Sequence, residues 1–239
     1  FPMFAKIDVN GDDEALAAVL AQGCWTPVTE FNTQAGWHAE DASADGREWQ
    51  LARGDETLAA ISWRQRGAHN IANACAAAAA LQAVGVTTAD AGAALVAFAG
   101  VKRRLELRGR PRDIAVYDDF AHHPTAITQT LSGLSADATG RVLAVFEPRS
   151  NTMRAGVHAQ SLAASFNRAD QVFVYTADLN WSASEVLSAL GQRLRQADDI
   201  DELIAHVSAA AKPGDTVVVM SNGGFGNIHE RLLAALAAG

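Results

Sequence analysis

The sequence predicts an α/β protein in two parts, of which the C-terminal part is built on a Rossmann-like, mostly parallel sheet. From residue 101 onward, short apolar strands alternate with amphipathic helices, which is typical of repeated βα units with buried strands. Before residue 100 the pattern is one helix, several short strands and then two helices. A chain of 239 residues that is 49% hydrophobic and 19% charged is long enough for two modest domains. We therefore expect a domain boundary near Gly100.

The elements expected in the first part follow from apolar spacing and turn residues. Leu16, Val19 and Leu20 share one face of a helix over residues 12–20, whose first turn is acidic. Asp45-Gly46 is typical of a hairpin turn, because both residues tolerate positive φ. Helices are expected over residues 70–84 and 87–98, the second with Thr88 as its N-cap. The expected strands are residues 25–31, 37–40, 47–52 and 57–63.

The second part is expected to alternate between strands and helices to the end of the chain. The predicted strands are residues 105–107, 114–117, 142–146, 171–175, a short piece near 194, and 216–220. The predicted helices are residues 124–134, 154–166, 183–190, 200–211 and 227–238. Such a series folds into a sheet that is covered by helices on both faces.

Composition excludes several classes of protein. The 19 Lys and Arg against 27 Asp and Glu give a net charge of −8, so a nucleic-acid partner is not expected. No apolar run reaches the roughly 18 residues of a membrane helix, so a membrane partner is not expected either. Cys24 and Cys75 fit neither a disulfide framework nor a four-ligand zinc site, which points to a reducing, cytoplasmic compartment.

A glycine-rich turn, Asn222-Gly223-Gly224-Phe225-Gly226, lies between the last predicted strand and the last helix. Its glycine spacing does not match the dinucleotide fingerprint, which also belongs to the first βα turn of a domain. A nicotinamide oxidoreductase is therefore disfavoured. A tight structural turn and a turn that contacts a ligand are equally compatible with the sequence.

Four ionisable residues follow the second strand of the C-terminal part: Asp118, Asp119, His122 and His123. They lie at the carboxyl end of that strand, where open α/β sheets bind ligands. Three interpretations remain open, namely ligand binding, a metal site that activates water, and a helix N-terminus in which Pro124 starts the helix. We expect no metal site, because no second ligand cluster occurs elsewhere.

Two further motifs carry side chains suited to a nucleotide. Asn70 and Asn73 are three residues apart on a helix, so their amides share a face and can both donate to and accept from an adenine edge. The alternative is that Asn70 caps the helix. Arg104, in the basic segment at the expected domain junction, suits a phosphate, although a solvated linker gives the same pattern.

The order of these motifs resembles the back half of the Mur ligases over essentially the whole chain. The resemblance is carried by Gly67-Ala68-His69-Asn70-Ile71-Ala72-Asn73-Ala74, Arg103-Arg104-Leu105-Glu106, Asp118-Asp119-Phe120-Ala121-His122-His123-Pro124, Glu147-Pro148-Arg149-Ser150-Asn151-Thr152-Met153-Arg154 and Met220-Ser221-Asn222-Gly223-Gly224-Phe225-Gly226. It implies an ATP- and Mg²⁺-dependent amide ligase of peptidoglycan recycling. In that reaction ATP phosphorylates the lactyl carboxylate of UDP-N-acetylmuramate. The α-amine of the murein tripeptide, L-alanyl-γ-D-glutamyl-meso-diaminopimelate, then attacks the acyl phosphate.

The resemblance also implies roles for single residues. Asn70 and Asn73 match the asparagines beside adenine, Arg104 matches the phosphate-contacting arginine, and Asp119 matches the C-terminal-domain aspartate near the nucleotide. The resemblance thus implies that Arg104 and Asp119 are catalytic. His122 and His123 are expected near the substrate. The segment that enters the next helix also offers side chains to the peptide, namely Arg149, Asn151, Thr152 and Arg154. The alternative for this segment is that Asn151 or Thr152 caps the helix and both arginines are solvated.

The sequence also departs from the family pattern. The 239 residues contain no Gly-x-x-Gly-Lys-Thr/Ser phosphate loop and no counterpart of the family's magnesium-organising glutamate, histidine and modified lysine. Residues 1–100 are therefore expected to be the C-terminal part of the family's central ATP-binding domain. Residues 101–239 are expected to be its C-terminal Rossmann-like domain, and the chain alone is expected to be inactive. The alternative is a freestanding peptide- or nucleotide-binding module without catalysis.

Overall fold

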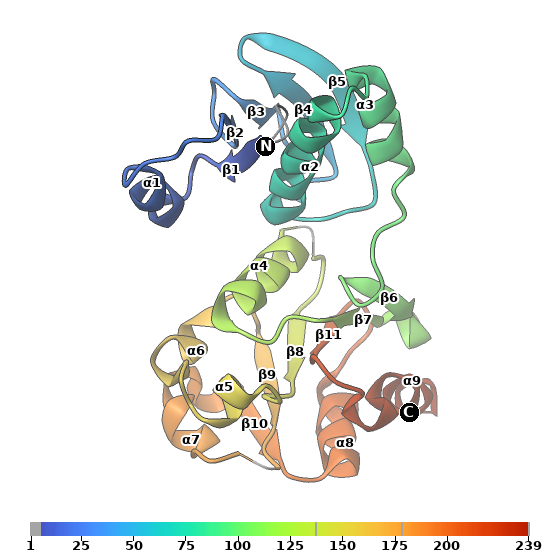
Figure 1. Cartoon of the computed structure of the whole chain (residues 1–239). Helices are drawn as coiled ribbons and strands as arrows, with labels where there is room; N and C mark the ends of the chain where they lie inside the picture. The colour runs from blue at the N-terminus through green and yellow to red at the C-terminus, as the bar shows by residue number, and fades with distance from the viewer. Residues whose placement is uncertain (1–5, 137, 178, 239) are drawn as a thin grey trace. The chain divides into compact units, whose positions relative to one another are not determined.

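The structure, a computed structural model, describes residues 6–136, 138–177 and 179–238 (Figure 1). The chain divides into two compact units, Phe1–Ala99 and Gly100–Gly239, each with its own sheet. Both units combine helices with a sheet, and the sheet of the second unit is mostly parallel, so the expected α/β class is confirmed. No helix in the described part of the chain is long and apolar enough to cross a membrane.

The first unit is a five-stranded sheet in the order β1-β2-β3-β4-β5, with two helices, α2 (Ala68–Ala83) and α3 (Thr88–Ala97), that contact it. The β1–β2 and β2–β3 pairs are parallel, whereas β3, β4 and β5 form an antiparallel meander. The core combines large rings from the strands, including Trp37 and Trp49, with the small alanines of α2. The strands are β1 (Ile7–Asn10), β2 (Val28–Phe31), β3 (Trp37–Glu40), β4 (Glu48–Arg53) and β5 (Glu56–Ser62).

Helix α1 (Glu14–Leu20) forms as expected; it buries no residue, and Val19 is 61% exposed. Two other details of the first unit differ from the expectations. Strand β1 was not expected at all. Helix α3 is capped by Thr87, whose hydroxyl accepts from the backbone N–H of Asp90, and not by Thr88.

The predicted hairpin signal Asp45-Gly46 lies in the connection between β3 and β4, which pair antiparallel, and Gly46 has φ of 77°. Gly54, with φ of 56°, joins β4 to β5 in a two-residue turn, because Arg53 pairs with Glu56. Asp45 lies in the longer loop between β3 and β4, where its carboxylate accepts from the Ser43 hydroxyl at 2.7 Å. Asp45 thus stabilises the expected hairpin connection between β3 and β4, which is longer than a two-residue turn.

The second unit has a six-stranded sheet in the order β10-β9-β8-β11-β7-β6, in which only the β6–β7 pair is antiparallel. Side chains of α4 and α6 share one apolar core with one face of the sheet, and those of α8 and α9 share another with the opposite face. The strands are β6 (Glu106–Gly109), β7 (Ala115–Asp119), β8 (Val142–Phe146), β9 (Gln171–Tyr175), β10 (Leu194–Ala197) and β11 (Thr216–Met220). The helices are α4 (Pro124–Ser135), α5 (Asn151–Arg154), α6 (Ala159–Ser165), α7 (Ala183–Val186), α8 (Ile200–Ala210) and α9 (Ile228–Ala238).

Two helices expected in this unit are interrupted. The helix predicted over residues 154–166 is broken between α5 and α6, where Gly156 has φ of 75° and lies against the Trp181 ring. The indole N–H of Trp181 donates to the carbonyl of Met153 at 2.6 Å and so fixes the end of α5. The helix predicted over residues 183–190 continues beyond α7 as a 3₁₀ turn, Ser188–Arg193.

The chain order creates a topological switch at β11. This strand lies between β7 and β8, and both neighbours run parallel to it. The connections that leave β7 and β8 run to α4 and to α5 and α6, whereas β11 is followed by α9 on the opposite face. Ligands of open α/β sheets bind at the carboxyl ends of strands where the connections diverge in this way. The carboxyl ends of β7, β8 and β11 are therefore the expected position of a ligand site.

Candidate functional site

A buried pair of polar side chains occupies this switch point. The residues at the ends of the three strands, Asp119, Phe146 and Met220, lie in register, and Glu147 and Ser221 follow them. Glu147 is 9% exposed and Ser221 is fully buried, and the Ser221 hydroxyl donates to the Glu147 carboxylate. The same hydroxyl accepts from the backbone N–H of Gly223 at 2.9 Å. Glu147 thereby fixes the start of the glycine-rich turn.

Arg103 attaches the segment before β6 to this turn. Its Nη2 donates to the carbonyls of Ser221 at 2.6 Å and Gly223 at 2.8 Å, and its Nε lies 3.5 Å from Asp118. The Asp118 carboxylate also lies 3.3 Å from Nε2 of His229. Burial opposes ionisation of Asp118, but the hydrogen bond and charge of His229, together with Arg103, outweigh it and hold the pKa below its ordinary value. Asp118 is therefore the counter-ion of Arg103.

Asp119 is fully engaged by hydrogen bonds from its own surroundings. It is 4% exposed, and one carboxylate oxygen accepts from the backbone N–H of Leu105 at 2.8 Å. The other oxygen accepts from the backbone N–H of Ala121 at 2.8 Å and from the Thr130 hydroxyl at 3.0 Å. These hydrogen bonds fix the backbone at Leu105 and at Ala121. Both carboxylate oxygens of Asp119 therefore already accept hydrogen bonds from the protein.

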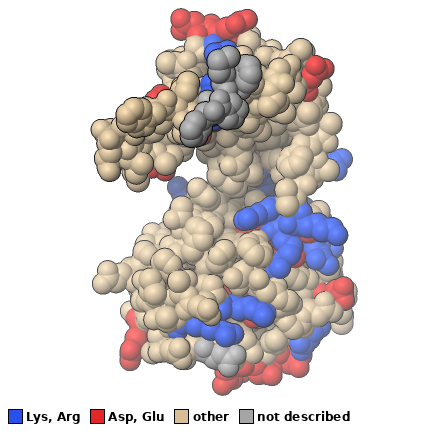
Figure 2. Space-filling model, in the orientation of Figure 1, with Lys and Arg blue, Asp and Glu red and all other residues tan. Residues whose placement is uncertain are grey.

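Arg104, by contrast, is exposed, and its guanidinium lies 5.4 Å from the centre of the Phe120 ring. Arg103 lies over the same ring at 5.2 Å. Within the described residues the Arg104 guanidinium forms no hydrogen bond or ion pair, so its donors are available to an anion. Figure 2 shows that Lys and Arg side chains gather on the second unit over the region of β6.

The two histidines adopt different protonation patterns. Nδ1 of His122 lies 2.9 Å from the carbonyl of Phe120, which can only accept, so this nitrogen carries a proton. Nδ1 of His123 instead accepts from the backbone N–H of Ala126 and caps α4. Burial and the charges of His122, His158 and Arg104 lower the pKa of His123. His123 is therefore a neutral donor through Nε2, and it lies within the electrostatic reach of Arg104.

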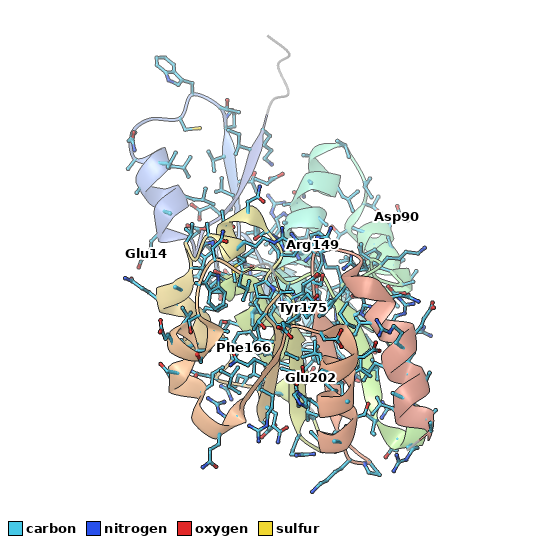
Figure 3. All side chains as sticks on the ribbon, turned by 90° about the horizontal axis from the view of Figure 1, so that it is seen from below. Glu14, Asp90, Arg149, Phe166, Tyr175 and Glu202 are labelled. Carbon is cyan, nitrogen blue, oxygen red and sulfur yellow. The ribbon has the colours of Figure 1, made fainter. Side chains whose placement is uncertain are left out.

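The segment after β8 presents three of its four predicted side chains at the surface. Arg149, Asn151 and Thr152 are exposed, and Arg154 is partly buried (Arg149 is labelled in Figure 3). The cap of α5 is Ser150, whose hydroxyl accepts from the backbone N–H of Met153 at 3.3 Å. The interpretation that Asn151 or Thr152 caps the helix is thus wrong. Both side chains remain directed outward from the first turn of α5.

In the first unit, Asn70 and Asn73 both lie on α2, as expected. The amide of Asn70 donates to the carbonyl of Arg66 at 2.8 Å, which leaves its oxygen to accept, and Asn73 is exposed. Helix α2 begins after Gly67, so Asn70 is not its N-cap. The two asparagines are the only proposed nucleotide contacts in this unit.

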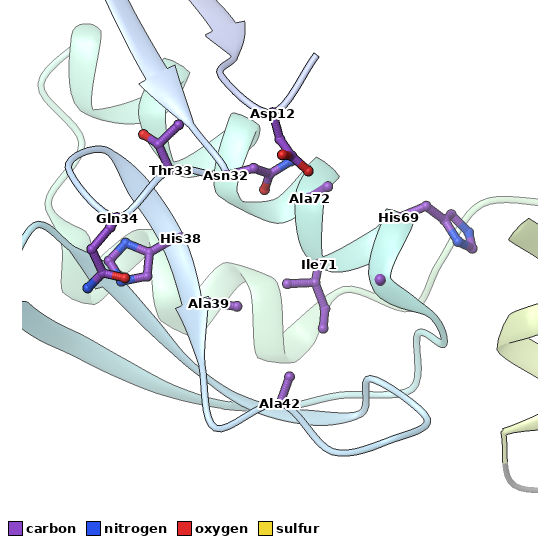
Figure 4. Close-up of a pocket in the computed structure, with 11 residues that line it drawn as sticks. Asp12, Asn32, Thr33, Gln34, His38, Ala39, Ala42, His69, Ile71 and Ala72 are labelled. Carbon is purple, nitrogen blue, oxygen red and sulfur yellow. The ribbon is translucent and has the colours of Figure 1, made fainter. Parts of the chain in front are cut away.

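A cavity of about 570 Å³ lies on a different side of α2 (Figure 4). Its lining includes Asn32, Gln34, His38, His69 and Ile71, but neither Asn70 nor Asn73. The structure therefore separates this cavity from the amides that the sequence assigned to a nucleotide.

The structure also tests whether the two aspartates suit a metal ion. Both oxygens of Asp118 face arginine or histidine nitrogens, and both oxygens of Asp119 accept N–H or O–H donors. A metal would have to displace these donors, so the donor set does not fit one. In the described ranges no three His, Cys, Asp or Glu side chains are grouped to hold a metal ion.

Sequence reasoning missed several members of this site. Glu147 and Ser221 lie 74 positions apart, and only the parallel pairing of β8 with β11 brings them together. Arg103 was overlooked in favour of its neighbour, because nothing in a basic dipeptide indicates which side chain turns inward. A polar residue directly after each buried strand is the signal that would have identified Glu147 and Ser221.

The family comparison matches residues 103–223 to the Mur ligase, glutamate ligase domain. This range contains β6 to β11 and the start of the glycine-rich turn. It therefore includes Arg103, Asp118, Asp119, Glu147 and Ser221 of the switch-point site.

Two curated relatives carry the same name, UDP-N-acetylmuramate–L-alanyl-γ-D-glutamyl-meso-2,6-diaminoheptandioate ligase. The protein of Escherichia coli K12 is 44% identical over 95% of this chain and 50% of its own length. The protein of Haemophilus influenzae is 39% identical over 95% of this chain and 51% of its own length. The chain thus spans about half the length of these relatives.

A solved structure gives the same result. The crystal structure of a murein peptide ligase from Psychrobacter arcticus is 41% identical and superimposes with a TM-score of 0.74. The match covers 99% of this chain and 52% of that one.

Proposed function

The chain belongs to the Mur ligase family, and from this premise we infer that it forms part of an ATP-dependent ligase that joins UDP-N-acetylmuramate to the murein tripeptide. The tripeptide, L-alanyl-γ-D-glutamyl-meso-diaminopimelate, is the substrate in the names of the two curated relatives. The reaction activates the lactyl carboxylate with ATP and then joins it to the peptide's α-amine, in peptidoglycan recycling. The observation that carries the proposal is Arg149, at the switch point of a domain that matches this family, whose side chain is exposed and forms no hydrogen bond or ion pair within the described residues.

Residues of each unit are proposed to act in this reaction. Arg104, whose guanidinium N–H groups donate to no described residue, neutralises charge on the transferred phosphoryl group. Asp119 holds the backbone that carries Arg104 and acts as a positioning residue. Asn70 and Asn73 supply the acceptor and donor that suit an adenine edge. Mg²⁺ would neutralise the phosphates when bound, and the occupied oxygens of Asp118 and Asp119 do not suit them as its ligands.

The peptide is proposed to bind at the carboxyl ends of β8 and β11. The tripeptide carries several carboxylates, and the Arg149 guanidinium offers a fork that fits one of them. Arg154 is proposed to contact a second carboxylate. Ser150 caps α5, so the exposed side chains of Asn151 and Thr152 are not needed as caps. They are able to pair with peptide amides. His122 and His123 border the same edge of the sheet, and neutral His123 donates through Nε2 without adding charge.

The proposal is tested with the full-length product of the gene that encodes this chain. Mass spectrometry of the reaction should detect UDP-N-acetylmuramoyl-tripeptide only when ATP, Mg²⁺, UDP-N-acetylmuramate and tripeptide are all present. The ADP released should equal the amide formed. A full-length protein that binds tripeptide or nucleotide but forms no amide would instead support a binding module without catalysis.

A further inference from the structure

We propose that Gly223 is a positioning residue for the tripeptide, because its missing side chain leaves the surface on which the Arg149 guanidinium lies. This inference rests on the proposed function and extends it to a residue that contacts no substrate itself. It concerns the glycine-rich turn, whose role the sequence leaves open.

The first observation is steric. A Cβ atom built on Gly223 would lie 2.5 Å from Cδ and 2.6 Å from Cζ of Arg149, and closer still to Nη1. Non-bonded heavy atoms pack at about 3.5 to 4.0 Å, so any side chain at this position would push the guanidinium away. Gly223 does not have positive φ, so glycine is not required there by the backbone. The contact with Arg149 is the constraint that the structure places on this residue.

The second observation is that the turn is held from two directions. The Ser221 hydroxyl, fixed by the buried Glu147 carboxylate, accepts from the N–H of Gly223. Arg103 donates to the carbonyl of the same glycine at 2.8 Å. Both backbone polar groups of Gly223 are therefore hydrogen-bonded, and these bonds resist displacement of the turn by the Arg149 side chain.

The third observation is that few other contacts restrict the side-chain conformation of Arg149. It is exposed, and among the described residues its guanidinium makes no hydrogen bond or ion pair. A long, freely rotating arginine loses side-chain entropy when it binds a carboxylate, and a surface that limits its rotamers lowers this cost. Gly223 thus orients a side chain that the peptide would otherwise have to order.

Gly224 provides a matched control. A Cβ built on Gly224 meets no atom within 4 Å, and its φ of −78° is accessible to alanine. Gly223→Ala and Gly224→Ala therefore add the same methyl group to neighbouring positions of one turn. Only the first of them affects Arg149.

The experiment is calorimetric titration of the tripeptide into this 239-residue chain as wild type, Gly223→Ala, Gly224→Ala, Arg149→Ala and the Gly223→Ala/Arg149→Ala double variant. We expect Gly223→Ala and Arg149→Ala each to weaken binding roughly tenfold or more, and Gly224→Ala to change it less than about twofold. Once Arg149 is truncated, Gly223→Ala should add less than about twofold. In the full-length product, Gly223→Ala should raise the KM for tripeptide and leave the KM for ATP unchanged.

Equal tripeptide affinity of Gly223→Ala and Gly224→Ala would overturn the inference. A loss of affinity in the double variant equal to the sum of the losses in Gly223→Ala and Arg149→Ala would also overturn it. The double variant must also fold, because truncation of Arg149 removes the steric conflict, and a double variant that unfolds contradicts the account. Failure of the proposed function has a different signature, since folded wild type would then not bind the tripeptide at all.

Discussion

The carboxylate of Asp119 accepts a 2.8 Å hydrogen bond from the backbone amide of Leu105, the residue that directly follows Arg104. On the other side of Arg104, the carbonyl of Arg103 accepts from the amide of Phe120, also at 2.8 Å. Arg103 and Leu105 both have positive φ, at 59° and 47°, a conformation that costs non-glycine residues about 1 kcal/mol or more each. The end of β7 thus holds a strained segment in place and fixes where Arg104 projects.

We predict that Asp119→Asn destabilises the chain and slows the full-length enzyme. The new amide group faces N–H donors with a donor of its own, which leaves a buried backbone N–H unpaired at a cost of about 2 kcal/mol. Urea unfolding and steady-state kinetics measure the two effects. Thr130→Val is the control, because it removes one bond to Asp119 and leaves the bond to Leu105 intact. An equal decrease in kcat for Asp119→Asn and Thr130→Val would show that the hydrogen bond from Leu105 to Asp119 has no specific role in catalysis.

Arg104→Ala should slow the chemical step more than Asn73→Ala in the full-length enzyme. Arg104 meets charge that develops at the phosphoryl group, whereas Asn73 mainly positions adenine. The kcat should therefore fall by about 100-fold or more for Arg104→Ala, while Asn73→Ala chiefly raises the KM for ATP. If both variants lose only affinity for ATP, the division of roles is wrong.

The 239-residue chain alone should not turn over. It contains no phosphate loop to hold the β- and γ-phosphates of ATP, as phosphoryl transfer in this family pattern requires. Release of ADP is measured with UDP-N-acetylmuramate, tripeptide, Mg²⁺ and ATP present. Turnover at an ordinary enzymatic rate, about 1 s⁻¹ or faster, contradicts this prediction.

Asp215→Asn should destabilise the second unit, with an effect that depends on pH. Asp215 is 4% exposed and pairs with Arg141 at 2.6 Å. Burial opposes its ionisation, but Arg141 and the backbone amides of Lys212 and Arg141 prevail, so the pKa lies below the ordinary 3.8. A lowered pKa stabilises the fold at pH values above 3.8, and this stability is lost as the pH falls through the folded-state value.

The free energy of unfolding should therefore differ by about 2 kcal/mol between wild type and Asp215→Asn at pH 7, and the difference should shrink as the pH falls below about 4. Urea unfolding at several pH values measures this. Asp113→Asn is the control, because its pair with Arg110 is exposed on both sides and should contribute less than about 0.5 kcal/mol. If the difference in free energy of unfolding between wild type and Asp215→Asn grew as the pH fell, the pKa of Asp215 would be raised, not lowered, by folding.

Periodicity predicted three parallel strands of the second unit well, because β8, β9 and β11 are short, mostly apolar runs. Strands β8, β9 and β11 have the expected bounds, as buried strands between clear turns should. The break at Gly156 was missed because the Trp181 ring that packs there is remote in sequence. The apolar face of α1 buries no residue, because apolar spacing predicts a helix but does not reveal whether a partner surface exists.

The candidate site was predictable only in its outline. Residues at strand ends, such as Asp119 and Arg149, could be placed at one sheet edge from the βα order alone. Which of them points inward depends on tertiary contacts. The family resemblance placed Asp119 near the nucleotide, and only the structure shows that its oxygens accept hydrogen bonds from Leu105, Ala121 and Thr130. The contact of Arg149 with Gly223 depends on strand order, which adjacent residues do not encode.

The central claim, that the second substrate is the tripeptide, is tested most directly by competition. The full-length enzyme is given UDP-N-acetylmuramate and ATP with equal concentrations of tripeptide and free L-alanine, and both amide products are quantified by mass spectrometry. Both amines share the reacting group, but only the tripeptide carries the distal carboxylates proposed to pair with Arg149 and Arg154, each pair being worth about 1.5 kcal/mol or more. The account predicts at least about 100-fold more tripeptide product. A product mixture dominated by the L-alanine adduct would contradict it.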